Sequence, residues 1–157
     1  MNELSYSTIM FRNVISKEYL DIDLKNLNEV TTHFLNEVTT HFLNEVKHYD
    51  LNENEPLILT INQLMKNEKV NITIYSSINN LSSLHDSFEF QSYLYIDQML
   101  HNQLRPLNYE EDIKKGLEDI ERFAKENQLQ RISPYYFILN DVNGFKWIDI
   151  KVKVMEY

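Results

Sequence analysis

The sequence predicts an α+β fold made of two β-α-β-β halves, with an antiparallel sheet and two long helices. Apolar residues alternate in short segments and recur at helical spacing in longer ones, and the order strand, helix, strand, strand occurs twice. A polar segment rich in Ser and Asn, 76–87, separates the two series. At 157 residues the chain is most simply one domain, so we expect a single domain over 1–157, with halves at about 6–78 and about 87–155.

The first half is expected to contain a strand, a long helix and a hairpin. Alternating apolar residues predict the first strand, and a helical pattern follows from Asp23 to about Asp50, until Pro56 interrupts it. Two alternating segments then flank the polar pair at 67–68, which predicts an antiparallel hairpin. The four expected elements cover 7–16, 23–50, 57–64 and 70–77.

The second half repeats this order with clearer boundary signals. Asn108 followed by Glu111 forms a capping box, and apolar residues then recur at helical spacing. The segment 141–144 reads Asp-Val-Asn-Gly between two apolar runs, which predicts a tight hairpin. The four expected elements cover 88–100, 108–127, 132–140 and 145–154.

A verbatim repeat lies inside the predicted first helix. Residues 28–43 contain the octapeptide NEVTTHFL twice, and 44–46 begin a third copy. We interpret this as a tandem duplication that lengthened the helix by about 12 Å and turned the following residues by about 80°. The sheet beneath is sized for the shorter helix, so we expect some apolar repeat residues to be exposed or to form a homodimer through the extended helix. The residues concerned are Phe34, Leu35, Phe42 and Leu43.

Composition argues against several kinds of site. A formal net charge of −9 would repel phosphates, so we expect no nucleic-acid partner. Two glycines are too few for a phosphate-binding loop, and without cysteine there is no disulfide, zinc finger or thiol nucleophile. His33 and His41 lie eight positions apart, whereas a metal needs several converging ligands. We therefore expect solvated histidines, no metal and no cofactor.

The sequence shows no sign of a membrane association. Residues 1–20 lack the unbroken apolar segment of a signal peptide, and no stretch approaches the roughly 18 apolar residues of a membrane-spanning helix. The expected location is the cytoplasm.

The segment 134–141 reads PYYFILND, and 148–154 reads IDIKVKV. With these two motifs the chain resembles the GyrI-like family, the effector-binding domains also found behind AraC-type and MerR-type DNA-binding modules. The family typically has P-F-E-I-Y-L-N-D and then T-E-I-x-I-P-V at these places. Four positions of the family motifs differ in this chain. In the first motif the family's acidic residue falls on Tyr136 and its tyrosine on Ile138. In the second motif the family's glutamate falls on Asp149 and its proline on Lys153.

The resemblance implies a groove between the halves, lined by the strand faces opposite the helices. Strand alternation then assigns the lining. It places on the helix side Phe88, Phe90, Leu94 and Ile96 of one strand and Ile148, Ile150, Val152 and Val154 of another. An aromatic and acidic lining suits a cationic or flat ligand, although the same aromatics could simply pack between the halves. The candidate ligand-binding residues are Tyr75, Glu89, Tyr93, Tyr95, Tyr136, Trp147 and Asp149.

We therefore expect a non-enzymatic binding protein whose groove takes a small amphipathic or cationic molecule or a protein segment. The alternative is an accessory interaction protein of a bacterial secretion or toxin system, because the chain also resembles small proteins of low-GC Gram-positive bacteria encoded near type VII secretion clusters. Catalysis ranks third. G-x-S-x-G is absent, and only Glu89 with Asp149 suggests an acid/base pair.

Overall fold

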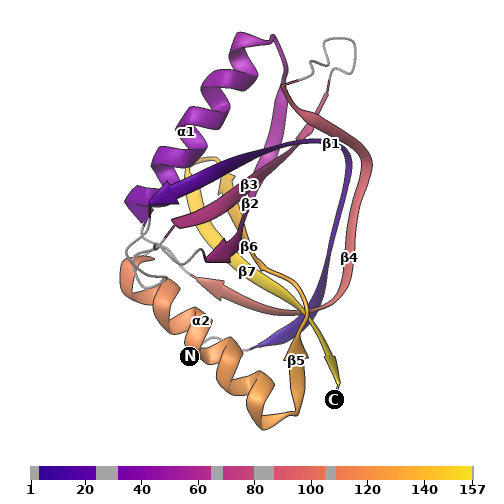
Figure 1. Ribbon diagram of the computed structural model, residues 1–157, viewed down its shortest axis with the longest axis vertical. Helices are drawn as coiled ribbons and strands as arrows, with labels where there is room; N and C mark the ends of the chain where they lie inside the picture. Colours follow the sequence, from indigo (N-terminus) through magenta and orange to yellow (C-terminus); the bar gives the residue numbers. More distant parts are fainter. Residues whose placement is uncertain (1–3, 24–31, 65–68, 80–86, 105–108, 157) are drawn as a thin grey trace.

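The computed structural model describes residues 4–23, 32–64, 69–79, 87–104 and 109–156, and Figure 1 shows how their elements are arranged. The order strand, helix, strand, strand occurs twice, as predicted, with one short additional strand after the second helix. The elements are β1 (Ser5–Asp23), α1 (Thr32–His48), β2 (Glu53–Leu64), β3 (Lys69–Ile78), β4 (Glu89–Leu104), α2 (Tyr109–Glu126), β5 (Leu129–Arg131), β6 (Tyr135–Val142) and β7 (Phe145–Glu156).

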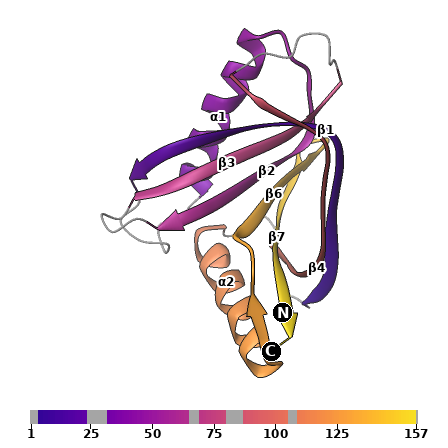
Figure 2. The same cartoon turned by 45° about the vertical axis from the view of Figure 1, so that its right-hand side comes forward.

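The described strands form one antiparallel sheet that closes on itself. Its seven strands lie in the order β4-β1-β3-β2-β6-β7-β5, and β4 also pairs with β7. All strands except β5 therefore form a ring, and β5 extends the sheet beyond β7. Both helices lie outside this ring (Figures 1 and 2). The ring is thus the frame that brings residues of distant strands face to face.

Two long bent strands, β1 and β4, make the closure possible. They pair with each other through residues 5–16 and 89–101, and each then leaves the other to join a different partner. The far end of β1 pairs with β3, and the far end of β4 pairs with β7. Asn13 and Gln98 have a left-handed backbone, with φ of 53° at each, and Gln98 lies at the register shift between the pairs Ser7–Met99 and Ile9–Ile96.

The larger core lies between the helices and the outer face of the ring. Phe42 and Val46 of α1 and Ile113 and Ile120 of α2 are at most 1% exposed and pack on apolar strand residues. In β7 the predicted helix-side residues are confirmed as buried: Ile148, Ile150, Val152 and Val154. Burial of a large apolar side chain contributes roughly 1.5–3 kcal/mol, so this core holds both helices on the sheet.

The predicted start of the first helix is wrong. Asp23 is the last residue of β1 and pairs with Lys69 of β3, because the strand pairing with β3 continues past the predicted end at residue 16. The described α1 has 17 residues and α2 has 18, so the described first helix is not the longer one. Residues 24–31, including the start of the first repeat copy, lie outside the described residues.

The second repeat copy is well integrated in the fold. Phe42 is fully buried, so it is not one of the repeat residues that are exposed, and Leu43 packs partly against the same core. Glu45, in the third partial copy, forms an ion pair with Lys17 and accepts a hydrogen bond of 3.0 Å from Tyr19 Oη. The side chains of Phe34 and Leu35 lie outside the described residues, so a homodimer through this helix remains a prediction.

The hairpin turn predicted for the second half is confirmed, whereas the side chains of the capping box, Asn108 and Glu111, lie outside the described residues. Asn143 and Gly144 both have positive φ, 53° and 85°, as a two-residue hairpin turn requires, and Gly144 N donates to Asp141 Oδ1 at 3.0 Å. The helix expected at 108–127 is α2, and no described helix is long and apolar enough to span a membrane.

Candidate ligand-binding face

A second apolar cluster, made only of strand residues, lies on the side of the sheet opposite the helices. Its residues come from β1, β2, β3, β4 and β6, which occupy opposing parts of the ring, so they line the ring's inside. We call this side of the sheet the inner face. The buried members are Ile9, Val14, Ile58, Leu94, Met99, Tyr136 and Ile138, with partly buried Phe11, Tyr75 and Ile96 against them.

Strand register aligns the polar and aromatic residues of the inner face in two neighbouring rows. Directly paired residues of adjacent antiparallel strands point to the same side of the sheet, so each row is a line of neighbouring side chains. The first row is Glu89, Ser16, Tyr75, Ile58, Ile138 and Asp149. The second row is Glu18, Thr73, Thr60, Tyr136, Lys151, His101 and Ser5.

Tyr75 and Tyr136 form the aromatic centre of this face. Their ring centroids are 6.4 Å apart, with the planes inclined by 39°. Burial, followed by the nearby Glu18 and Glu89 carboxylates, raises the pKa of Tyr75. Burial, with Tyr75 beside it, raises the pKa of Tyr136 to about 12. Both phenols are therefore neutral at physiological pH, and carboxylates flank the pair on the Tyr75 side.

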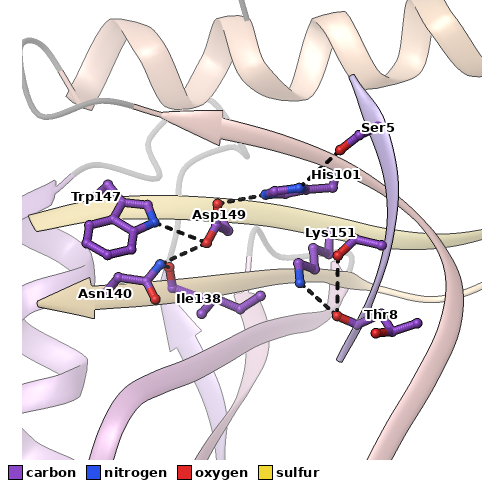
Figure 3. A network of polar contacts seen from close by, with 9 residues as sticks. Ser5, Thr8, His101, Ile138, Asn140, Trp147, Asp149 and Lys151 are labelled. Atoms are coloured by element: carbon purple, nitrogen blue, oxygen red, sulfur yellow. Dashed lines mark hydrogen bonds and ion pairs between the residues drawn. The ribbon is translucent and has the colours of Figure 1, made fainter. Parts of the chain in front are cut away.

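Asp149 is held at the other end of the first row by three side chains (Figure 3). Its Oδ1 accepts from His101 Nε2 at 2.7 Å, and its Oδ2 accepts from Asn140 Nδ2 at 2.9 Å and from Trp147 Nε1 at 3.2 Å. Burial raises the pKa of Asp149, but the bonds from His101, Asn140 and Trp147 outweigh it and lower the pKa overall. The carboxylate is therefore ionised and already partnered within the chain.

Lys151 links the two strands that flank β4 in the ring. Its Nζ donates to Thr8 O at 2.7 Å, which joins β7 to β1 (Figure 3). Burial lowers the pKa of Lys151, and the Asp149 charge opposes this shift. The ammonium group thus lies next to the apolar cluster, on the direct cross-strand neighbour of Tyr136, and is bonded to the β1 backbone.

The structure brings together five of the seven candidate ligand-binding residues. Tyr75, Glu89, Tyr136 and Asp149 lie in the two inner rows, and Trp147 contacts Asp149 beside them. The other two, Tyr93 and Tyr95, are 57% and 59% exposed and lie on the outer side of β4.

Strand alternation assigned the middle of β4 to the wrong sides. Leu94 and Ile96 belong to the inner cluster, whereas the sequence placed them on the helix side. Phe88 does pack against α1, with its ring 5.9 Å from that of Phe42. The bends of β1 and β4 rotate the paired strands between these positions, so a single parity does not hold along the whole strand.

The inner-face residues that were not among the sequence-based candidates include Ser5, Glu18, Met99 and His101. Glu18 was missed because the first strand was ended at residue 16. Ser5 and His101 are 96 positions apart in the sequence and meet only through the pairing of β1 with β4. A correct β1 boundary, continued by alternation, would have placed Glu18 on this face.

A separate pocket of about 300 Å³ opens between α2 and the β5 edge. Arg131 lies over the ring of Tyr135 at 4.8 Å, and Tyr135 Oη donates to Glu121 Oε1 at 3.2 Å, so its principal polar side chains contact one another. Among the described residues no three acidic or histidine side chains gather as a metal site would require.

The fold is shared with several solved structures. The crystal structure of the EcmrR C-terminal domain matches with a TM-score of 0.66 and 9% identity, over 100% of this chain and 99% of that one. SAV2435 bound to tetraphenylphosphonium matches with a TM-score of 0.57 and 11% identity, over 99% and 94%. The predicted GyrI-like α+β fold is confirmed by these likenesses, which at such identities concern the fold alone.

EcmrR also matches in the cryo-EM structure of an EcmrR–DNA complex, with a TM-score of 0.70 and 11% identity, over 99% of this chain and 58% of that one. The expectation that this chain binds no nucleic acid therefore gains no support and stays a prediction. The comparisons also give no support to the resemblance to type VII secretion proteins, and the cytoplasmic location stays a prediction.

A comparison with curated proteins finds no match. A family model described as a domain of unknown function, DUF5085, matches residues 10–156.

Proposed function

The chain belongs to the DUF5085 family, a domain family of unknown function, so we propose a function from the geometry of its inner face. We propose that the inner face binds a hydrophobic organic cation and does not convert it chemically. The observation that carries this proposal is the Tyr75–Tyr136 pair, which lies within an apolar cluster and has carboxylates on one side. Aromatic faces attract cations, and desolvated sites strengthen that attraction to about 2 kcal/mol.

The charge distribution supports a cation over an anion. Glu89 and Glu18 lie in the same cross-strand rows as Tyr75 and Tyr136, and the chain carries a net charge of −9. Lys151 belongs to the same face but donates to Thr8 O. A flat or multi-ring cation would contact the tyrosines and the apolar cluster while its charge faces the glutamates.

The likeness to SAV2435 gives independent support. That protein is described as bound to tetraphenylphosphonium, a cation surrounded by four aromatic rings, and its chain shares the present fold over nearly its full length. Tetraphenylphosphonium is therefore a suitable first probe for this chain.

The test is a titration with tetraphenylphosphonium followed by the fluorescence of Trp147, the only tryptophan. We expect saturable binding that Tyr75→Leu weakens about 3- to 30-fold, the equivalent of a cation–π contribution of about 0.7–2 kcal/mol. Glu89→Gln should also weaken binding and reduce its dependence on salt.

Two controls separate site binding from general adsorption. Tyr95→Leu removes an outward tyrosine of β4, and triphenylphosphine oxide replaces the cation by a neutral aromatic molecule. We expect the first to leave the affinity unchanged and the second to bind much more weakly. Equal losses for Tyr75→Leu and Tyr95→Leu, or equal binding of the neutral compound, would reject the proposal.

A protein partner is the second candidate, favoured by the outer side of the β1–β4 ribbon. Met10, Tyr93 and Tyr95 are 61%, 57% and 59% exposed there, and Met10 pairs directly with Tyr95. Exposed aromatic residues of this kind are enriched in protein interfaces. A pull-down from the source cell with the wild type and with a Tyr93→Ser/Tyr95→Ser variant tests it, and a partner retained equally by both would count against this surface.

A further inference from the structure

One end of the inner face carries a serine, a histidine and a carboxylate in line (Figure 3). Ser5 Oγ lies 3.3 Å from His101 Nδ1, and His101 Nε2 lies 2.7 Å from Asp149 Oδ1. The three residues come from β1, β4 and β7. Ser5 is the direct cross-strand partner of His101, so the sheet itself sets their separation.

The contacts of Asp149 decide which imidazole nitrogen carries the proton. An ionised carboxylate can only accept, so the short bond places the hydrogen on His101 Nε2. In the neutral ring Nδ1 then bears the lone pair, and this lone pair faces the Ser5 hydroxyl. Asn140 and Trp147 hold the other oxygen of Asp149, which keeps the carboxylate in place. A serine next to an oriented, unprotonated nitrogen is the arrangement needed for nucleophilic activation.

The solvent exposure of the three side chains fits a reactive serine supported by a shielded histidine–carboxylate pair. Ser5 is exposed, so a reagent or substrate can reach its hydroxyl. The side chains of His101 and Asp149 are only 22% and 15% exposed, so their bond is largely shielded from water. Ser7, two positions along β1, instead has its hydroxyl bonded to Thr8 O at 3.5 Å and provides a neighbouring serine without the histidine.

We propose that Ser5, oriented towards His101 and Asp149, is a nucleophile that cleaves small activated carboxylic esters. Ser5 Oγ bonds to the ester carbonyl carbon while its proton passes to His101 Nδ1. The carbon–alkoxide bond breaks, the leaving alcohol takes that proton, and an acyl-serine remains. Water then attacks the acyl-serine with His101 as base, which releases the carboxylic acid and restores Ser5. General-base assistance of this kind contributes about 10²–10⁴-fold in rate.

This activity is independent of cation binding at Tyr75. Ser5 lies at the end of the second row, beyond Lys151 and His101. The proposed cation instead contacts Tyr75 and Tyr136, with its charge towards Glu18 and Glu89 at the opposite ends of the rows. If the wild-type protein binds tetraphenylphosphonium but cleaves no ester, the proposal for Ser5 is wrong and the proposed cation binding stands. If it cleaves the ester but does not bind the cation, the proposed cation binding is wrong and the proposal for Ser5 stands.

The decisive experiment labels the full chain with a serine-directed fluorophosphonate and locates the label by peptide mass spectrometry. We expect one label, on Ser5, which Ser5→Ala abolishes and the matched Ser7→Ala retains. His101→Gln should slow labelling at least about 100-fold, because the base is lost. A label on another residue, or equal labelling of wild type and Ser5→Ala, overturns the proposal, and so does the absence of any label.

Hydrolysis of p-nitrophenyl acetate supplies the catalytic readout. We expect Ser5→Ala to lower the rate to that of the unassisted reaction, with Ser7→Ala unchanged. Asp149 acts through His101, so Asp149→Asn should lower kcat at least about tenfold and leave KM unchanged, in protein whose circular dichroism shows it to be folded. A rise in KM alone, or a rate for Ser5→Ala equal to the wild type, would contradict the assignment.

Discussion

Replacing Asp149 by asparagine should destabilise the protein by about 2–4 kcal/mol. The carboxylate accepts from His101, Asn140 and Trp147. Asparagine keeps the volume but loses the charge and one acceptor oxygen, so at least one charge-assisted bond is lost, at about 1.5–3 kcal/mol, and a shielded donor loses its partner. Because the three bonds share one group, their losses do not add in full.

Urea unfolding followed by Trp147 fluorescence and by circular dichroism measures this change. The matched control is Asp97→Asn, which removes an acid bonded to Lys153 Nζ at 2.6 Å on the surface, where screening by water makes the loss small. Equal shifts of the two unfolding midpoints would refute the reasoning, since they would mean that the Asp149 network contributes no more than a surface pair.

The pH dependence provides a second check on Asp149. Its pKa is lowered in the folded state, so its stabilising contribution is fully present above the ordinary value of 3.8 and is lost as the pH falls through the lowered pKa. The difference in unfolding free energy between wild type and Asp149→Asn should therefore be constant near neutrality and shrink below about pH 4. A difference that grows on acidification would contradict this sign.

The packing of the two helices yields three more expectations. A Cβ at Gly116 would lie 2.9 Å from Leu104 Cδ2 and 3.2 Å from Ile150 Cδ1, so Gly116→Ala should cost about 1–3 kcal/mol in urea unfolding, and an unchanged midpoint would contradict that packing. Phe42→Ala should lower the free energy of unfolding by about 3–5 kcal/mol. Phe145→Ala, at a side chain that is 59% exposed, should change it little. Similar losses for the two variants would count against the buried position of Phe42. Deleting 28–35 leaves the buried second copy intact, so the variant should fold, melt no lower and sediment as a monomer, and failure to fold would disprove the duplication account.

Local sequence signals were sufficient where the structure depends on neighbouring residues. Asn143 and Gly144 take the positive φ that their hairpin needs, and α2 lies within a residue of its predicted bounds. Alternation also placed β7 correctly, because that strand keeps one face on the helix-side core along its length. Element order, and with it the fold class, followed from these local rules.

The inner face was predictable only in part. Tyr75, Tyr136 and Asp149 lie on strands whose parity is regular, so alternation or a family motif was enough to select them. Tyr93 and Tyr95 were placed on the same face by the same rule, but the rotation of the β1–β4 ribbon turns them outward. A bend depends on which strands pair at each end, and no short segment carries that information.

By itself the sequence determined the kind and order of the elements, because helical and strand periodicity and turn chemistry act over a few residues. Only the tertiary structure decided that β1 continues to Asp23, that β4 closes the ring on β7, and that Ser5, His101 and Asp149 meet. Ser5 and His101 are separated by 96 positions, and His101 and Asp149 by 48. Contacts over such distances follow from strand register across the whole sheet, where a shift of one residue would move each side chain to the other face.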